Sequence, residues 1–263
     1  MPHHGHLDLY PVFIYTPKQN GSGNTDRTTA MRGEDMTESL RRAKEDVLWG
    51  CNTMCARGYV LGTSGNISAR VAGESLFVVT PSSLPYDDLT ADDLVVMDMD
   101  GCVREGSRKP SIEYDLHREI LLARPDAGCV IHTHSTFATA VSAMQDVDAV
   151  PVIDIETALY IGGDIPVAPF APPGSAALAN SAATALQDRA GLLLEGHGAI
   201  GVGRTMKDAM IASDHVERCC EMFCIIRSAG RLRPLPAGPL HALCEQSRKN
   251  RGVTSRSPLD KKV

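Results

Sequence analysis

The sequence has few aromatic residues and no excess of basic ones. Phe, Trp and Tyr make up 5% of the 263 residues, so an aromatic platform for stacking nucleobases is not expected. Lys and Arg number 26 against 32 Asp and Glu, which gives a net charge of -6, whereas a nucleic-acid-binding surface requires a basic excess. No apolar run reaches the roughly 20 residues that a membrane-spanning helix needs. We therefore expect neither a nucleic-acid partner nor a membrane partner.

The cysteines lack the C-x-x-C spacing that is typical of structural zinc sites and redox motifs. Eight are present: Cys51, Cys55, Cys102, Cys129, Cys219, Cys220, Cys224 and Cys244. They are interpreted as free thiols in a reducing compartment, which predicts a cytoplasmic protein. The first residues carry no basic start before an interrupted apolar stretch, so a signal peptide is not expected either.

The chain divides into three parts by composition. Residues 1–36 are rich in Gly, Asn, Thr and Arg without sustained periodicity, which predicts a disordered leader. Residues 37–243 alternate apolar runs with turn residues and form the predicted catalytic domain. Residues 244–263 are polar and charged, and we expect a flexible tail there.

Within the predicted domain, strand and helix patterns alternate without a strict βαβ rhythm. Helical spacing of apolar residues predicts helices over residues 37–57, 111–123, 136–144, 174–188 and 205–229. Short alternating runs predict strands in NISARV, SLFVVTP, LVVMDMDG, CVIHTH and GLLLEGHGAIGVG. Residues 145–173 are expected to form a long loop rich in Pro and Gly. This mixture indicates an α/β fold with a largely antiparallel sheet covered by helices.

His132 and His134 are separated by one residue at the end of a predicted strand. Residues two apart on a strand point to the same face, so the two imidazoles would lie side by side, as ligands of one metal ion do. His197 lies between two glycines in a predicted turn between strands. Three imidazoles would leave a coordination position open, which is typical of a catalytic zinc site. An ordinary pair of buried or surface histidines is the alternative interpretation.

Glu113 lies early in the predicted helix over residues 111–123. A carboxylate in the first turn of a helix commonly interacts with the helix dipole, and a catalytic role is the alternative. His117 follows one turn later and is interpreted as a structural neighbour of Glu113.

A segment of small residues, GTSGNIS, precedes the first predicted strand. It contains Thr63, Ser64, Gly65 and Asn66. Small residues free backbone N–H groups to face an anion, and hydroxyl and amide side chains add further donors. Ser82 and Ser83 form a second segment of this kind. Both segments lack the spacing of a P-loop or a dinucleotide-binding fingerprint, and a plain tight turn is the alternative for each.

Taken in order, five segments resemble the class II aldolase/adducin superfamily, which includes aldolases, epimerases and decarboxylases. They are GTSGNIS, TPSSLPYDDL, KPSIEYDLH, VIHTHSTFATAVS and EGHGAIGVG, and the resemblance covers about residues 38–228. It implies a three-layer α/β/α fold around a central, mostly antiparallel sheet. It also implies a homotetramer with active sites between neighbouring subunits.

The resemblance implies roles for individual residues as well. His132, His134 and His197 match the family's ligands for Zn²⁺, with Mn²⁺ or Co²⁺ as alternatives. Glu113 matches the carboxylate that contacts the metal at rest and acts as acid and base. The loop from Thr63 to Asn66 and Ser111 match the pocket for the substrate phosphate, and Ser82 and Ser83 are expected to bind substrate as well. A substrate with adjacent carbonyl and hydroxyl oxygens would chelate the metal, which would stabilise an enediolate during C–C bond cleavage.

Three positions depart from the aldolase pattern. Ile112 stands where the phosphate pocket has a second serine, and Ser83 stands where sugar-phosphate enzymes often have glycine. The aldolase also has a tyrosine acid after a proline that matches Pro151, and here the next tyrosine is Tyr160.

The leading hypothesis is a zinc-dependent lyase of the aldolase type that acts on a sugar phosphate or a similar hydroxy-carbonyl compound. The alternative is a metal-dependent decarboxylase of a hydroxy, keto or aromatic acid, which Ile112 favours. Arg70 or Arg108 would then receive a carboxylate, although an exposed salt bridge is the favoured interpretation of each. A zinc hydrolase would explain the histidines but not the glycine-rich loop. A non-catalytic adducin-like scaffold would have lost the metal ligands, which this sequence retains.

Overall fold

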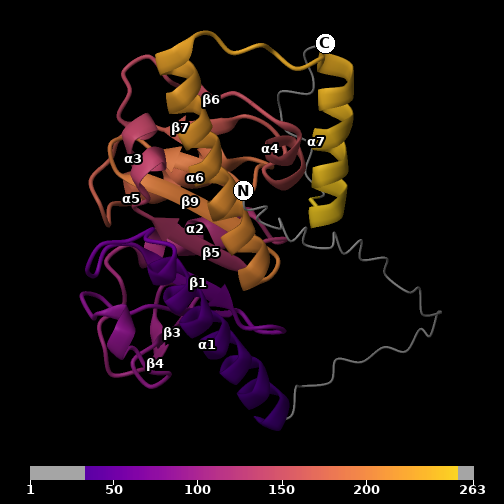
Figure 1. The fold of residues 1–263 in the computed structure, drawn as a ribbon. Helices are drawn as coiled ribbons and strands as arrows, with labels where there is room; N and C mark the ends of the chain where they lie inside the picture. The colour runs from indigo at the N-terminus through magenta and orange to yellow at the C-terminus, as the bar shows by residue number, and fades with distance from the viewer. Residues whose placement is uncertain (1–32, 254–263) are drawn as a thin grey trace, which may run out of the picture.

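The structure, a computed structural model, describes residues 33–253 and contains one sheet of nine strands within that range (Figure 1). The strands are β1 (Asn66–Arg70), β2 (Leu76–Val79), β3 (Val95–Asp98), β4 (Val103–Glu105), β5 (Cys129–Thr133), β6 (Ala149–Val150), β7 (Ile165–Ala168), β8 (Gly191–Leu194) and β9 (Gly198–Gly203). Their order across the sheet is β4-β3-β2-β1-β5-β9-β8-β7-β6. All neighbours pair antiparallel except β7 and β8, which are parallel.

Helices cover both faces of this sheet. The first face packs against α1 (Gly33–Ala56), α3 (Thr136–Ser142) and α6 (Met206–Ala229), and the second against α2 (Tyr114–Ala123) and α5 (Ala176–Leu186). Side chains alternate between the layers, as they must on a strand: Val130 joins the α2/α5 core, whereas Ile131 joins the α1/α6 core. This arrangement confirms the predicted three-layer α/β/α fold.

Two further helices, α4 (Ile155–Tyr160) and α7 (Ala237–Arg251), pack against each other. The segment between β5 and α5 holds α4 together with β6 and β7. The prediction of one long loop over residues 145–173 was therefore wrong. These elements are only two to six residues long, too short for a hydrophobic period to be visible in the sequence.

The prediction of a flexible tail from residue 244 was also wrong over the described part, because α7 continues to Arg251. Cys244 and Ser247 are buried, and the Nε atom of Arg248 lies 2.5 Å from a carboxylate oxygen of the buried Asp188. Arg248 of the charged helix α7 thus pairs with a buried carboxylate that is distant in the sequence. The hydrophobic pattern of the sequence does not predict such a contact.

The predicted boundaries shift at two other helices. Helix α1 begins at Gly33 instead of Thr37, and residues 1–32 of the predicted leader lie outside the described residues, as do residues 254–263. Helix α2 begins at Tyr114, so Glu113 is its N-cap residue and not part of its first turn.

The described residues bear on membrane-spanning helices and on the state of the cysteines. Within residues 33–253, no helix combines the length and the apolar composition required to cross a membrane. All eight cysteines fall in this range, and each is a free thiol, as predicted.

Candidate active site

Three adjacent strands bring the predicted site residues together. In the order β1-β5-β9, Asn66 on β1 pairs with His132 on β5, which pairs with Ile200 on β9. The turn between β8 and β9 carries His197 to the same end of β5. Gly65 has a φ of 74°, and a Cβ atom there would lie 2.7 Å from the carbonyl oxygen of His132, so only glycine allows this close approach.

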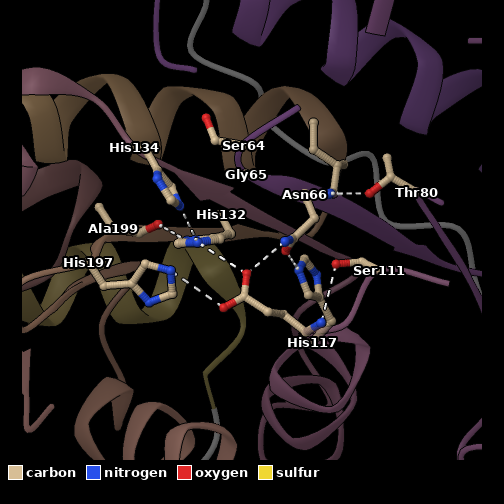
Figure 2. A network of polar contacts seen from close by, with 12 residues as sticks. Ser64, Gly65, Asn66, Thr80, Ser111, His117, His132, His134, His197 and Ala199 are labelled. Carbon is tan, nitrogen blue, oxygen red and sulfur yellow. Dashed lines mark hydrogen bonds and ion pairs between the residues drawn. The ribbon is translucent and has the colours of Figure 1, made fainter. Parts of the chain in front are cut away.

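The imidazoles of His132, His134 and His197 converge on one point (Figure 2). One nitrogen from each ring lies within 4.8 Å of those of the other two, and the Nε2 atoms of His132 and His134 are 3.0 Å apart. His134 lies one residue beyond β5, where its backbone N–H donates to the carbonyl of Tyr59 at 2.9 Å. The structure thus brings together all three predicted metal ligands.

Hydrogen bonding and burial leave these rings ready to bind a cation. The Nδ1 atom of His132 lies 3.0 Å from the carbonyl oxygen of Ala199, to which it donates, so its Nε2 lone pair faces the other two rings. Burial, aided by the neighbouring imidazoles, holds the pKa of His132 well below its ordinary value of 6.5. Burial also lowers the pKa of His134. Neutral imidazole is the form that ligates a metal.

Glu113 completes the cluster from α2. Its carboxylate is 5% exposed; Oε2 lies 3.4 Å from Nε2 of His132, and Oε1 lies 3.5 Å from Nε2 of His197. The Oε1 atom has no hydrogen-bond donor among residues 33–253. Three imidazole nitrogens and a buried carboxylate oxygen without a donor form a set of electron-pair donors that fits a divalent cation.

A second set of polar side chains forms hydrogen bonds with Glu113 and with one another. Its Oε2 atom accepts a hydrogen bond from Nδ2 of Asn66 at 2.9 Å, and its backbone N–H donates to Oγ of Ser111 at 3.3 Å. The Oδ1 atom of Asn66 is in turn bonded to Nε2 of His117. His117 is thus a structural neighbour of Glu113, as its spacing of four residues predicted, and the link between them through Asn66 was not predicted.

The match to a family model agrees with this fold and this donor set. The model described as Class II Aldolase and Adducin N-terminal domain matches residues 45–224. The chain belongs to this family.

Named class II aldolases match over most of their length. The chain is 37% identical to the 5-methylthioribulose-1-phosphate/5-deoxyribulose-1-phosphate aldolase of Rhodospirillum rubrum over 185 residues, 70% of this chain and 81% of the relative. It is 30% identical to the 5-deoxy-D-ribulose 1-phosphate aldolase of Bacillus thuringiensis serovar kurstaki over 207 residues, 79% and 96% of the two chains. The solved structure of an L-fuculose 1-phosphate aldolase superposes with a TM-score of 0.74 at 29% identity, covering 78% of this chain and 95% of that one.

The residues expected to bind phosphate lie in three segments of the chain, and two of these residues, Asn66 and Ser111, contact Glu113. An isolated bridge between Pro81 and Pro110 joins the turn that holds Ser82 and Ser83 to the segment that ends in Ser111. Ser83 has a φ of 59°, in the left-handed region that glycine adopts most easily, at the position where the resemblance to sugar-phosphate enzymes led us to expect glycine.

Two residues of the glycine-rich loop, Thr63 and Ser64, make no described contact with the carboxylate of Glu113. The hydroxyl of Ser64 bonds to the backbone of Leu61, with Oγ 2.9 Å from the carbonyl oxygen and 3.1 Å from the amide nitrogen, and so closes its own turn. Thr63 is exposed in the loop before β1. Asn66 is the member of this loop that contacts Glu113 directly.

Three other residues considered from the sequence have contacts elsewhere. Arg108 forms an exposed ion pair with Asp93 at 2.8 Å, and Arg70 donates to the backbone carbonyl of Leu121 at 2.6 Å. Tyr160 stacks on His215 with ring centroids 4.2 Å apart. No described contact links any of the three to the histidine cluster.

Proposed function

We propose that this protein is a zinc-dependent lyase of the aldolase type that reversibly cleaves a carbon–carbon bond of a ketose 1-phosphate. The observation that carries the proposal is the convergence of three imidazole nitrogens with a buried glutamate whose carboxylate oxygens lie 3.4 Å and 3.5 Å from two of the rings. The relatives named above supply the substrate class, since each is named for a ketose that carries a 1-phosphate.

His132, His134 and His197 would hold the metal. An all-nitrogen set of three histidines suits Zn²⁺, with Mn²⁺ or Co²⁺ as alternatives. Bound there, the divalent cation would act as a Lewis acid toward the carbonyl oxygen of the substrate.

The remaining chemistry falls to the residues of the chain. In a ketose 1-phosphate, the hydroxyl group on C4 loses its proton as the C3–C4 bond breaks, and C4 leaves with the carbons beyond it as an aldehyde. The electron pair stays on C3, in conjugation with the C2 carbonyl as an enediolate, and becomes a C3–H bond when a proton arrives. Glu113 is our candidate for moving this proton, because Oε1 has no donor while Asn66 holds Oε2.

The substrate phosphate would lie between the segments of the chain that were expected to bind it. The donors we propose are the backbone and side chains of the following residues: Thr63, Ser64, Gly65, Asn66, Ser82, Ser83 and Ser111. Clusters of small residues expose backbone N–H groups to anions in this way.

One observation favours a second candidate, decarboxylation of a hydroxy acid. Ile112 is 63% exposed where class II aldolases carry a serine, and it offers an apolar surface in place of a phosphate donor. The expected receptors for a carboxylate, Arg70 and Arg108, are engaged elsewhere, which weighs against this candidate.

A turnover panel distinguishes the two candidates. Protein loaded with Zn²⁺ is incubated with 5-deoxyribulose 1-phosphate, with another ketose 1-phosphate and with a hydroxy-aromatic acid. Release of dihydroxyacetone phosphate from the ketose phosphates supports the aldolase. Release of CO₂ from the acid, with the ketose phosphates left intact, supports the decarboxylase and contradicts our proposal.

We further propose a cytoplasmic homotetramer with active sites between subunits. Free thiols at all eight cysteines are typical of a reducing compartment. The exposed side chains of Leu61 and Phe170 offer apolar surface for subunit contacts. Light scattering coupled to gel filtration tests this assembly, and a monomeric mass would contradict it.

A further inference from the structure

Four buried side chains form a continuous hydrogen-bonded chain that ends on the carboxylate of Glu113. Ser68 on β1 lies with Oγ 2.8 Å from Nδ1 of His117 on α2. The Nε2 atom of His117 is bonded to Oδ1 of Asn66, and Nδ2 of Asn66 donates to Oε2 of Glu113 at 2.9 Å. Figure 2 shows His117 and Asn66 side by side in this arrangement.

The carboxylate of Glu113 determines which group donates in each of these hydrogen bonds. An ionised carboxylate only accepts hydrogen bonds, so Asn66 must present its NH₂ group to Glu113 and its carbonyl oxygen to His117. His117 must then carry its proton on Nε2, which leaves a lone pair on Nδ1. The hydroxyl of Ser68 therefore donates to Nδ1.

The environment of His117 favours this single neutral tautomer. The side chain is completely buried, and burial lowers its pKa to about 3. A proton on Nδ1 instead would place a lone pair of Nε2 against the carbonyl oxygen of Asn66. The amide would then rotate and turn that oxygen toward the carboxylate of Glu113, which is repulsive.

We propose that His117 is a positioning residue that, as the Nε2–H tautomer, locks the amide of Asn66 so that Oε2 of Glu113 is held and Oε1 stays free. Its consequence for proton transfer rests on the proposed aldolase function, whereas the tautomer and the bonding order do not. The competing interpretation is a packed core histidine that has no influence on the orientation of Glu113.

The tautomer is measurable without any activity assay. Ring ¹⁵N spectra of the whole protein labelled at histidine, compared with those of His117→Gln, assign the His117 signals. We expect a protonated, pyrrole-like Nε2 and an unprotonated, pyridine-like Nδ1 at pH 7. The reverse pattern, or two tautomers in exchange, would overturn the proposal even if the protein proves to be an aldolase.

A double-mutant cycle tests whether His117 acts through Asn66. We expect His117→Phe to lower kcat by roughly 10- to 100-fold, typical for a residue behind a metal site, with little change in KM. His117→Gln, which keeps a donor, should recover part of kcat and also covers the case in which the Phe variant fails to fold. In an Asn66→Ala background, His117→Phe should cause no further loss, because the group it orients is gone.

The control is His215→Phe, which removes a half-buried histidine outside this chain of bonds and should leave kcat unchanged. An equal and independent loss from His117→Phe in both backgrounds would overturn the positioning role. If the wild-type protein cleaves no ketose phosphate, the proposed function fails, while the tautomer measurement still decides the bonding order.

Discussion

The Nδ1 atom of His132 donates to the carbonyl oxygen of Ala199, 3.0 Å away on the neighbouring strand β9. This bond ties the orientation of a ring that we propose as a metal ligand to the backbone ladder between β5 and β9. The ring therefore presents Nε2 to His134 and His197 as a consequence of the sheet itself. Ligands held in this way need little rearrangement when a cation binds.

Metal content is the first expected consequence. Purified protein should carry about one divalent transition metal ion per chain by elemental analysis, as three-histidine zinc sites do. His132→Ala should lose most of this metal, since it removes a ligand whose lone pair already faces the site. His241→Ala, which removes an exposed histidine of α7, serves as the control and should retain the metal. Equal metal in the two variants would contradict the assignment of the ligands.

Glu113→Gln should abolish most turnover while preserving the fold. The amide keeps the size of the side chain but cannot accept and return a proton, and such groups contribute roughly 10²- to 10⁴-fold to the rate. Steady-state kinetics and circular dichroism measure the two effects. Glu119→Gln changes a carboxylate of the same helix that pairs with Arg118 at 2.9 Å, and it should keep full activity. A Glu113→Gln enzyme with wild-type kcat would remove Glu113 from the mechanism.

The sequence predicted those parts of the site that depend on local spacing. His132 and His134 lie two apart on a strand, and their shared direction follows from the period of the strand alone. The contacts of His117 were not predicted, because they depend on the packing of α2 against β1, which brings Ser68 and Asn66 to its two ring nitrogens.

The elements that the sequence did not predict are those stabilised by distant contacts. Helix α7 packs Cys244 against Val152 and Ala158, and its Arg248 pairs with Asp188, which lies 60 residues earlier in the chain. Elements such as β6, with two residues, are too short to show a hydrophobic period in the sequence. Strand β6 is instead defined by its pairing with the neighbouring strand β7.

Stability should fall as the pH decreases, because His117 is buried in its neutral form. The pKa of His117 is about 3 in the folded chain, whereas an ordinary imidazole, such as that of the unfolded chain, has a pKa of 6.5. Between these pH values the unfolded chain binds a proton that the folded chain does not. The free energy of unfolding should therefore decrease by about 1.4 kcal/mol for each pH unit below 6.5, an effect absent above that pH. Urea denaturation of wild type and His117→Gln from pH 7 to pH 4 measures this contribution.

The variant should show a smaller slope than the wild type, while the buried His132 adds the same trend to both proteins. His241→Gln, at an exposed position, should leave the slope unchanged. Parallel curves for wild type and His117→Gln would show that His117 titrates equally in both states.

Gly65→Ala should destabilise the protein more than Gly58→Ala. Both glycines have positive φ angles, 74° and 67°, so each alanine would carry a left-handed strain of about 1–2 kcal/mol. Only at Gly65 would the new Cβ atom meet other groups, the carbonyl oxygen of His132 and a methyl group of Val60, both at 2.7 Å. We expect a total loss of about 2–5 kcal/mol at Gly65, since overpacking adds a further 1–3 kcal/mol. Equal losses in urea denaturation would argue against the close approach of β1 to β5.

Incorporation of solvent hydrogen tests the proposed carbon–carbon cleavage most directly. Zinc-loaded protein would cleave 5-deoxyribulose 1-phosphate in D₂O, and mass spectrometry would analyse the dihydroxyacetone phosphate that is released. Protonation of the enediolate at C3 predicts one deuterium on that carbon, in a single stereochemical position if Glu113 delivers it from one face. Release of CO₂ from a hydroxy acid with no cleavage of the ketose phosphate, or a product without deuterium at C3, would contradict the account.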